Sequence, residues 1–142
     1  MIIGKYTEKH IDKLYLVFRV LIGLLFFQHG GQKLFGWFGG LSGDSASVAL
    51  LSLMGLAGVI ELVGGLAIAL GFFSRLAALG GALEMIAAYF IVHFPQGLNP
   101  FTFPPGNGGE LALIYLASFL VILAFGSRKW SLEKSLLKKE IF

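Results

Sequence analysis

Four ionisable side chains, Arg19, Glu61, Glu84 and Glu110, lie within or at the ends of apolar stretches long enough to cross a lipid bilayer. A charge is costly inside a bilayer, so it is retained mainly where it meets a partner, a ligand or a proton. Charged residues make up only 13% of the 142 residues, and 56% are hydrophobic. We therefore expect an integral membrane protein whose chemistry centres on these side chains.

Arg19, Glu61 and Glu84 are expected at similar depth in the cytoplasmic half of the membrane. Counting at ~1.5 Å per residue places each of them on the order of 10 Å from the cytoplasmic end of its helix. Arg19 is long enough to bridge both carboxylates, which leaves one negative charge in excess. Either one glutamate is protonated, or Arg75 at the inner rim completes the charge balance. Glu61 and Glu84 are thus the best candidates for proton transfer.

A second polar group is expected in the outer half of the membrane. His29 and Lys33 are one helical turn apart, and His93 and Glu110 lie where the third apolar stretch ends and the fourth begins. These four side chains can converge at the outer mouth of a helical bundle. Two such groups joined through the interior would suit a buried polar ligand or a proton path.

Two other interpretations of these residues stay open. In the first, the pairs Arg19–Glu61 and Lys33–Glu110 are only interhelical ties that fix the order of the helices. In the second, His29 and His93 are the axial ligands of haem b. No other metal site is predicted.

Four apolar stretches could position these residues as transmembrane helices in an all-α, four-helix bundle. They run over residues 14–34, 50–71, 76–92 and 111–125, and a short amphipathic segment follows at 131–139. Lys and Arg gather before the first stretch, between the second and third, and after the fourth. Both termini are therefore expected in the cytoplasm, and the whole chain is interpreted as a single domain.

Small residues indicate which helix faces pack together. Gly58 and Gly65 share the face of Glu61, and Gly81 and other small residues surround Glu84. Small residues let helix backbones approach closely in lipid. Both carboxylates are therefore expected to point into the bundle.

The composition excludes several kinds of partner. The chain has no cysteine, which excludes disulfides, thiol redox chemistry and cysteine-ligated iron–sulfur clusters. The net charge of +3 comes from Lys and Arg beside the apolar stretches, where they contact lipid headgroups, so no nucleic-acid partner is expected. The loop 94–109 holds all four prolines and is expected to fold onto the bundle mouth or to form an ordinary ordered loop.

Short motifs recur in order along nearly the whole chain and resemble those of the DoxX family of small membrane proteins. They are Arg19-x-x-x-Gly23, His29-Gly30-x-x-Lys33-Leu34-Phe35, Glu61-x-x-Gly64-Gly65-Leu66, Gly71-x-x-x-Arg75, Glu84-Met85-x-x-Ala88, Gly109-Glu110-Leu111-Ala112, Gly126 and Ser131-Leu132-Glu133. The resemblance implies a four-helix bundle in a bacterial cytoplasmic membrane. It also implies a link to oxidoreductases, because relatives are described as subunits of a thiosulfate:quinone oxidoreductase or as membrane components of an oxidative-stress complex.

Carried over by position, the resemblance assigns ligand-binding roles to the polar signature. Its members are Arg19, His29, Lys33, Glu61, Arg75, Glu84 and Glu110. His93 is added as a ligand-binding candidate because it lies where the third apolar stretch ends. One expected function is a quinone-linked oxidoreductase subunit, in which Arg19, His29 or Lys33 donates to a quinone carbonyl. Electrons would come from a redox partner or a sulfur compound. The alternative is a non-catalytic membrane scaffold, small-molecule binder or transporter, alone or as a homo-oligomer.

Overall fold

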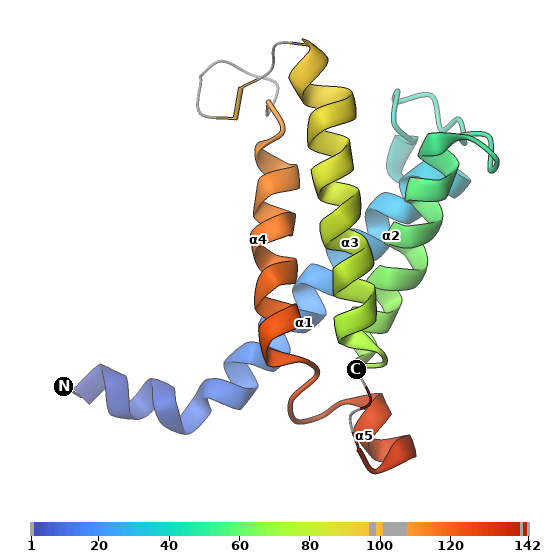
Figure 1. The fold of residues 1–142 in the computed structure, drawn as a ribbon. Helices are drawn as coiled ribbons and strands as arrows, with labels where there is room; N and C mark the ends of the chain where they lie inside the picture. The colour runs from blue at the N-terminus through green and yellow to red at the C-terminus, as the bar shows by residue number, and fades with distance from the viewer. Residues whose placement is uncertain (1, 97–98, 101–107, 140, 142) are drawn as a thin grey trace.

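The computed structural model describes residues 2–96, 99–100, 108–139 and 141, and within these ranges it is helical without a strand (Figure 1). Its α-helices are α1 (Ile2–Phe35), α2 (Leu53–Leu70), α3 (Ser74–Ala88), α4 (Glu110–Phe125) and α5 (Leu132–Leu137). Three short helical turns are η1 (Trp37–Gly39), η2 (Tyr89–His93) and η3 (Phe94–Gln96). Most of the predicted loop 94–109 lies outside the described residues.

The first helix is longer than the apolar pattern predicted. It begins at Ile2 rather than near Leu14, and its amino-terminal part projects away from the other helices (Figure 1). This part contains three lysines, which favour helix but lower the hydropathy, so an apolar count misses it. At ~1.5 Å per residue, α1 exceeds the thickness of a bilayer core.

The helices pack in chain order, with α1 along α2, α2 against α3 and α3 against α4. We call the end where α1 and the helical segment 74–96 finish, and where α2 and α4 begin, the loop end. The opposite end carries the α2–α3 turn, α5 and the carboxyl terminus, and we call it the clasp end (Figure 1). The two ends hold the two groups of polar residues described below.

A buried apolar core fills the middle of the molecule. Its members are Phe26, Ile68, Ala78, Ala82, Met85, Ala112, Tyr115, Phe119 and Ile122. Phe26 of α1 meets Phe119 of α4 edge-on, with ring centroids 4.7 Å apart, and Phe119 also lies against Gly81 of α3. The core thus joins all four long helices.

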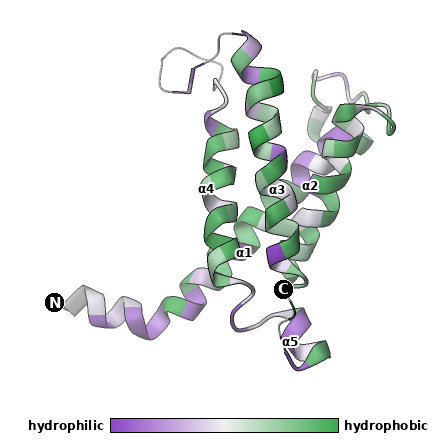
Figure 2. Ribbon diagram, in the orientation of Figure 1, coloured by the Kyte–Doolittle hydropathy of each residue, from purple (hydrophilic) through white to green (hydrophobic). Residues whose placement is uncertain are grey.

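The helices have apolar outward faces as well (Figure 2). Leu66 of α2, Leu83 of α3 and Leu120 of α4 are all exposed. Among the described residues, α2 and the continuous helical segment 74–96 are long and apolar enough to cross a membrane, and α4 is a shorter apolar helix. Large exposed apolar side chains on such helices are typical of contact with lipid.

Candidate functional site

An ion pair between α1 and α2 lies near the loop end. Lys33 Nζ is 2.5 Å from Glu61 Oε1, and the two side chains are only 14% and 5% exposed. Glu61 Oε2 is also buried, and it has no hydrogen-bond partner among the described residues. A buried carboxylate with an oxygen left unpaired is unusual, because each such oxygen costs desolvation energy.

A third ionisable group joins this pair from α3. The carboxyl group of Glu84 lies close enough to interact with the carboxyl group of Glu61 and with the charge of Lys33. Glu84 Oε2 is buried and also lacks a partner in the described part of the chain. We call Lys33, Glu61 and Glu84 the ion cluster. Two carboxyl groups and one ammonium group give it a surplus of negative charge unless it takes up one proton.

Two aromatic side chains border the ion cluster. His29 precedes Lys33 by one turn of α1 and lies close enough to interact with its charge. Its ring meets the Tyr115 ring of α4 edge-on, with centroids 5.8 Å apart, and Tyr115 lies close enough to Glu61 to interact with its charge. Each of the four long helices therefore contributes a polar side chain to this region.

Glycines bring α1 and α2 close enough for the ion pair to form. A Cβ atom at Gly30 would lie 2.6 Å from Gly58 O and 2.7 Å from the Cα of Leu62, so only glycine fits there. A Cβ atom at Gly58 would lie 3.1 Å from the Cβ of Lys33. This close approach lets the Lys33 side chain fold directly onto Glu61, and the glycine pattern correctly predicted the buried face.

The predicted bridge from Arg19 to the glutamates is wrong. Arg19 is 1% exposed, and its guanidinium donates to the carbonyls of Ser127 and Trp130 at the clasp end. Arg19 lies next to Gly71, which directly follows α2. Glu61 lies farther toward the loop end, where α2 packs against Gly30 and Lys33 of α1. The structure therefore exchanges the expected partners, because Lys33 takes the carboxylate and Arg19 takes backbone carbonyls.

The other predicted partners of the cluster also lie elsewhere. Arg75 donates from Nε to Leu123 O at 3.0 Å, because the last carbonyls of α4 are near and lack helical partners. Glu110 is exposed at the start of α4, so the predicted Lys33–Glu110 tie is replaced by Lys33–Glu61. His93 packs beside Gly109, and its Nδ1 is buried without a partner among the described residues.

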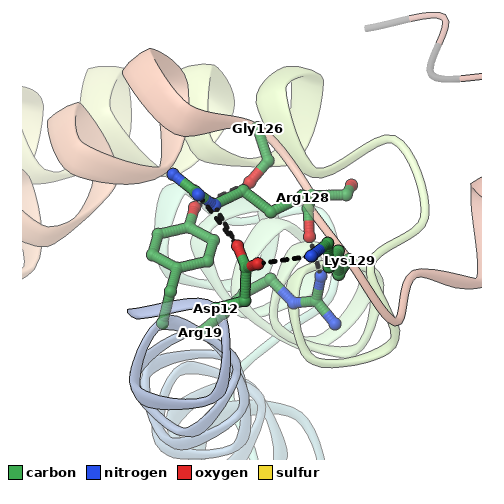
Figure 3. A network of polar contacts seen from close by, with 7 residues as sticks. Asp12, Arg19, Gly126, Arg128 and Lys129 are labelled. Carbon is green, nitrogen blue, oxygen red and sulfur yellow. Dashed lines mark hydrogen bonds and ion pairs between the residues drawn. The ribbon is translucent and has the colours of Figure 1, made fainter. Parts of the chain in front are cut away.

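A second polar network holds the clasp end. Asp12 pairs with Arg128 at 2.8 Å and with Lys129 at 2.9 Å, while Tyr15 donates to Gly126 O at 2.6 Å. Figure 3 shows these side chains from α1 meeting the segment that follows α4, with Arg19 beside them. Hydrogen bonds from Arg128 and Lys129 hold the pKa of Asp12 below its ordinary value. The network ties α1 to the carboxyl-terminal segment.

Glu133, to which the sequence motifs assigned no role, is fully buried at the clasp end. Its carboxylate accepts from Phe73 N at 3.2 Å and Ile141 N at 2.7 Å, and its own amide donates to Gly71 O at 3.1 Å. Phe73 precedes α3 with a φ of 48°, a left-handed conformation that is costly for a non-glycine residue. Glu133 thus stabilises the strained turn and complements the positive end of α3. Nothing in the amphipathic pattern of 131–139 distinguishes this inward carboxylate from a solvated one.

Comparisons with known proteins place this arrangement in a family. The DoxX family model matches residues 14–94, which include Arg19 and the ion cluster. A Haemophilus influenzae protein described only as uncharacterized is 36% identical over 132 residues, covering 93% of this chain and 97% of its own length. No solved structure matches the chain.

Proposed function

Because this chain belongs to the DoxX family of membrane-associated proteins, we propose that it is a multi-pass protein of the bacterial cytoplasmic membrane, with α1–α4 as a four-helix bundle. The packing of α1–α4 in chain order and their exposed apolar faces support this arrangement. At ~1.5 Å per residue, α4 is short for a bilayer, so it requires its flanking residues or a locally thinner membrane.

The proposed orientation puts both termini in the cytoplasm, which makes the clasp end cytoplasmic. Arg75, Arg128 and Lys129 lie at the clasp end, and the Lys-rich start of α1 projects on the same side. Between α1 and α2, the connection 36–52 carries Asp44 as its one charged residue. This asymmetry follows the preference of Lys and Arg for the cytoplasmic side.

We further propose that the ion cluster is the proton-carrying site of a quinone-linked oxidoreductase subunit. The observation that carries this proposal is the meeting of Lys33, Glu61 and Glu84, from three helices, with two buried carboxylate oxygens that have no partner in the described part of the chain. Ionisable groups kept inside a membrane protein usually serve ligand binding or proton movement. One proton held by the two carboxyl groups would balance the charge of Lys33.

The surrounding side chains suit the chemistry of a quinone. A quinone carbonyl needs a hydrogen-bond donor, which Lys33, His29 or the hydroxyl group of Tyr115 can provide, and reduction to a quinol consumes two protons. Glu61 and Glu84 can deliver a proton to such a carbonyl. The chain has no cysteine for an iron–sulfur cluster, so we propose that the electrons come from a partner protein or from a sulfur compound.

The test is to purify the protein from its native membrane in a mild detergent and to extract the bound quinone with organic solvent. We expect close to one quinone per chain, and less than half of that in Glu84→Gln and Lys33→Met. Glu8→Gln removes an exposed carboxylate from α1 and is the matched control. An absorption spectrum of the same sample tests the haem alternative, which requires a Soret band.

The scaffold alternative predicts a different result. If no quinone is extracted, and if Glu84→Gln and Lys33→Met alter only the thermal stability of the purified protein, the ion cluster is a structural tie between helices. The oxidoreductase proposal then fails.

A further inference from the structure

We infer that the ion cluster exchanges its proton with water at the loop end, and that the path to the clasp end is closed. The inference rests on the proposed function, in which Glu61 and Glu84 share a proton. With the proposed orientation, the site would take up and release protons on the outer side of the membrane. Quinone reduction at this site would then draw no protons from the cytoplasm.

The first observation is the apolar layer between the ion cluster and the clasp end. On α1, Phe26 lies two turns from both Arg19 and Lys33, and it is fully buried. Ile68, Phe119 and Ile122 are likewise 0% exposed and belong to the same buried cluster. A proton crossing this layer would have to leave every polar partner, which is costly in a dry, packed interior.

The polar side chains within this layer do not provide a path. Ser118 is 8% exposed, and its hydroxyl group donates to Ile114 O at 2.8 Å in its own helix. Ser127 and Ser74, which are fully buried, are joined at 3.0 Å within the clasp. Neither of these two hydrogen bonds reaches the ion cluster.

The second observation is the run of polar groups on the other side of the ion cluster. Lys33 is 14% exposed, and Glu84 is also partly exposed. Beyond Glu84, α3 continues into the π-helical turn η2, which ends at His93, whose buried Nδ1 has no partner among the residues that the structure describes. π-Helical turns are frequent at functional sites, and an unpaired imidazole nitrogen can accept or donate a proton.

The groups facing Glu84 come from every helix packed around it. Lys33 of α1 and Glu61 of α2 interact with Glu84 directly. His29 of α1 borders Lys33, and Tyr115 of α4 borders Glu61, while His93 lies farther along the helical segment of Glu84 itself. Glu61 is 4% exposed and keeps its unpaired oxygen inside this group. The group is therefore polar toward the loop end and apolar toward the clasp end.

The test uses dicyclohexylcarbodiimide, which crosses membranes and adds to protonated carboxyl groups in apolar surroundings. The carboxyl proton moves to a carbodiimide nitrogen and the oxygen bonds to the central carbon, so the adduct keeps both molecules and raises the mass of the chain. The full chain, with a protease site after Phe142, is reconstituted in vesicles in both orientations. Adding protease after labelling marks the molecules whose clasp end faces outward.

The external pH is raised from about 6 to about 9 while the internal pH is held constant. Over this range an exposed carboxylate stays ionised, so only a carboxyl group shielded from water changes its protonation. We expect labelling to fall several-fold in uncut molecules, whose loop end faces the changed pH, and to stay constant in cut molecules. Glu84→Gln and Glu61→Gln identify the labelled carboxyl group by intact mass, and Glu8→Gln is the control.

Each outcome decides between the two proposals. Labelling that follows the pH at the clasp end, or that responds to neither side, overturns the inference and leaves a proton-bearing carboxyl group in place. If both glutamine variants are labelled like the unmodified chain, or if no labelling occurs at about pH 6, the ion cluster holds no proton. In that case the proposed function itself fails.

Discussion

The ammonium group of Lys33 lies 2.5 Å from Glu61 Oε1, although the two residues are 28 positions apart and lie on different helices. The pair fixes the register of α1 against α2 at the loop end, where the glycines bring the two backbones together. It also leaves Glu84 as the carboxyl group without an ammonium partner of its own. The following predictions depend on this division of roles.

Removing Lys33 should destabilise the protein strongly. In Lys33→Met, the buried Glu61 loses its partner, and we expect the free energy of unfolding to fall by about 3–5 kcal/mol. The double variant Lys33→Met/Glu61→Gln should recover much of that loss, because no unpaired charge remains. Denaturant unfolding in detergent at neutral pH measures the free energy of unfolding of the unmodified protein and of both variants. A double variant no more stable than Lys33→Met would contradict the ion pair, and Lys9→Met, on the exposed part of α1, is the control.

The contact between α1 and α2 should not tolerate a methyl group at Gly30. A Cβ atom there would meet Gly58 O at 2.6 Å, so we expect Gly30→Ala to lower stability by about 1–3 kcal/mol through overpacking. Gly4→Ala is the matched control, since nothing lies within 4 Å of a Cβ atom at Gly4. At Gly4, in the projecting part of α1, the substitution to alanine should raise stability by about 0.5–1 kcal/mol. Equal effects at the two positions would show that close approach is unimportant.

The carboxyl-terminal segment should detach when Glu133 is changed. Glu133→Ala leaves the amides of Phe73 and Ile141 without their acceptor, so we expect stability to fall by about 1–3 kcal/mol. Limited proteolysis after Arg128 should become faster, and the ion cluster should be unaffected. Lys134→Ala, which alters an exposed side chain of α5, serves as the control. Unchanged proteolysis in Glu133→Ala would contradict the role of Glu133 in holding the carboxyl-terminal segment.

Acid should weaken the link between α1 and the segment after α4. The pKa of Asp12 is held below its ordinary value of 3.8 by hydrogen bonds from Lys129 and Arg128. A depressed pKa in the folded protein means that the stabilisation is complete above the ordinary pKa and is lost as the pH falls through the folded value. The unfolding temperature should therefore decrease below about pH 4, and less steeply in Asp12→Asn. The same acid profile in both chains would exclude Asp12 as the cause.

The sequence predicted the apolar helices and the inward carboxylates because both follow from local patterns. Hydropathy locates α2, α3 and α4 to within a few residues, and the glycines around Glu61 mark its buried face. Local patterns do not fix how far one helix slides along another. The prediction therefore assigned Arg19, instead of Lys33, to the carboxylates.

Partners that come from the backbone were also invisible in the sequence. The carbonyls that accept from Arg19 and Arg75 lack helical hydrogen bonds only because α4 ends where it does. Any residue type could supply such a carbonyl. Glu133 looks like one of many charges in a basic tail until the α2–α3 turn is placed beside it. These contacts depend on the tertiary arrangement, which residue types alone do not specify.

The hydrogen bonds of Arg19 at the clasp end have a consequence for biosynthesis. Arg19 donates to carbonyls that lie 108 and 111 positions later in the chain. A ribosome exposes α1 to the insertion machinery long before it has made Ser127 and Trp130, so the guanidinium enters the membrane without these acceptors. Closure of the clasp end must therefore follow the translation of Ser127 and Trp130.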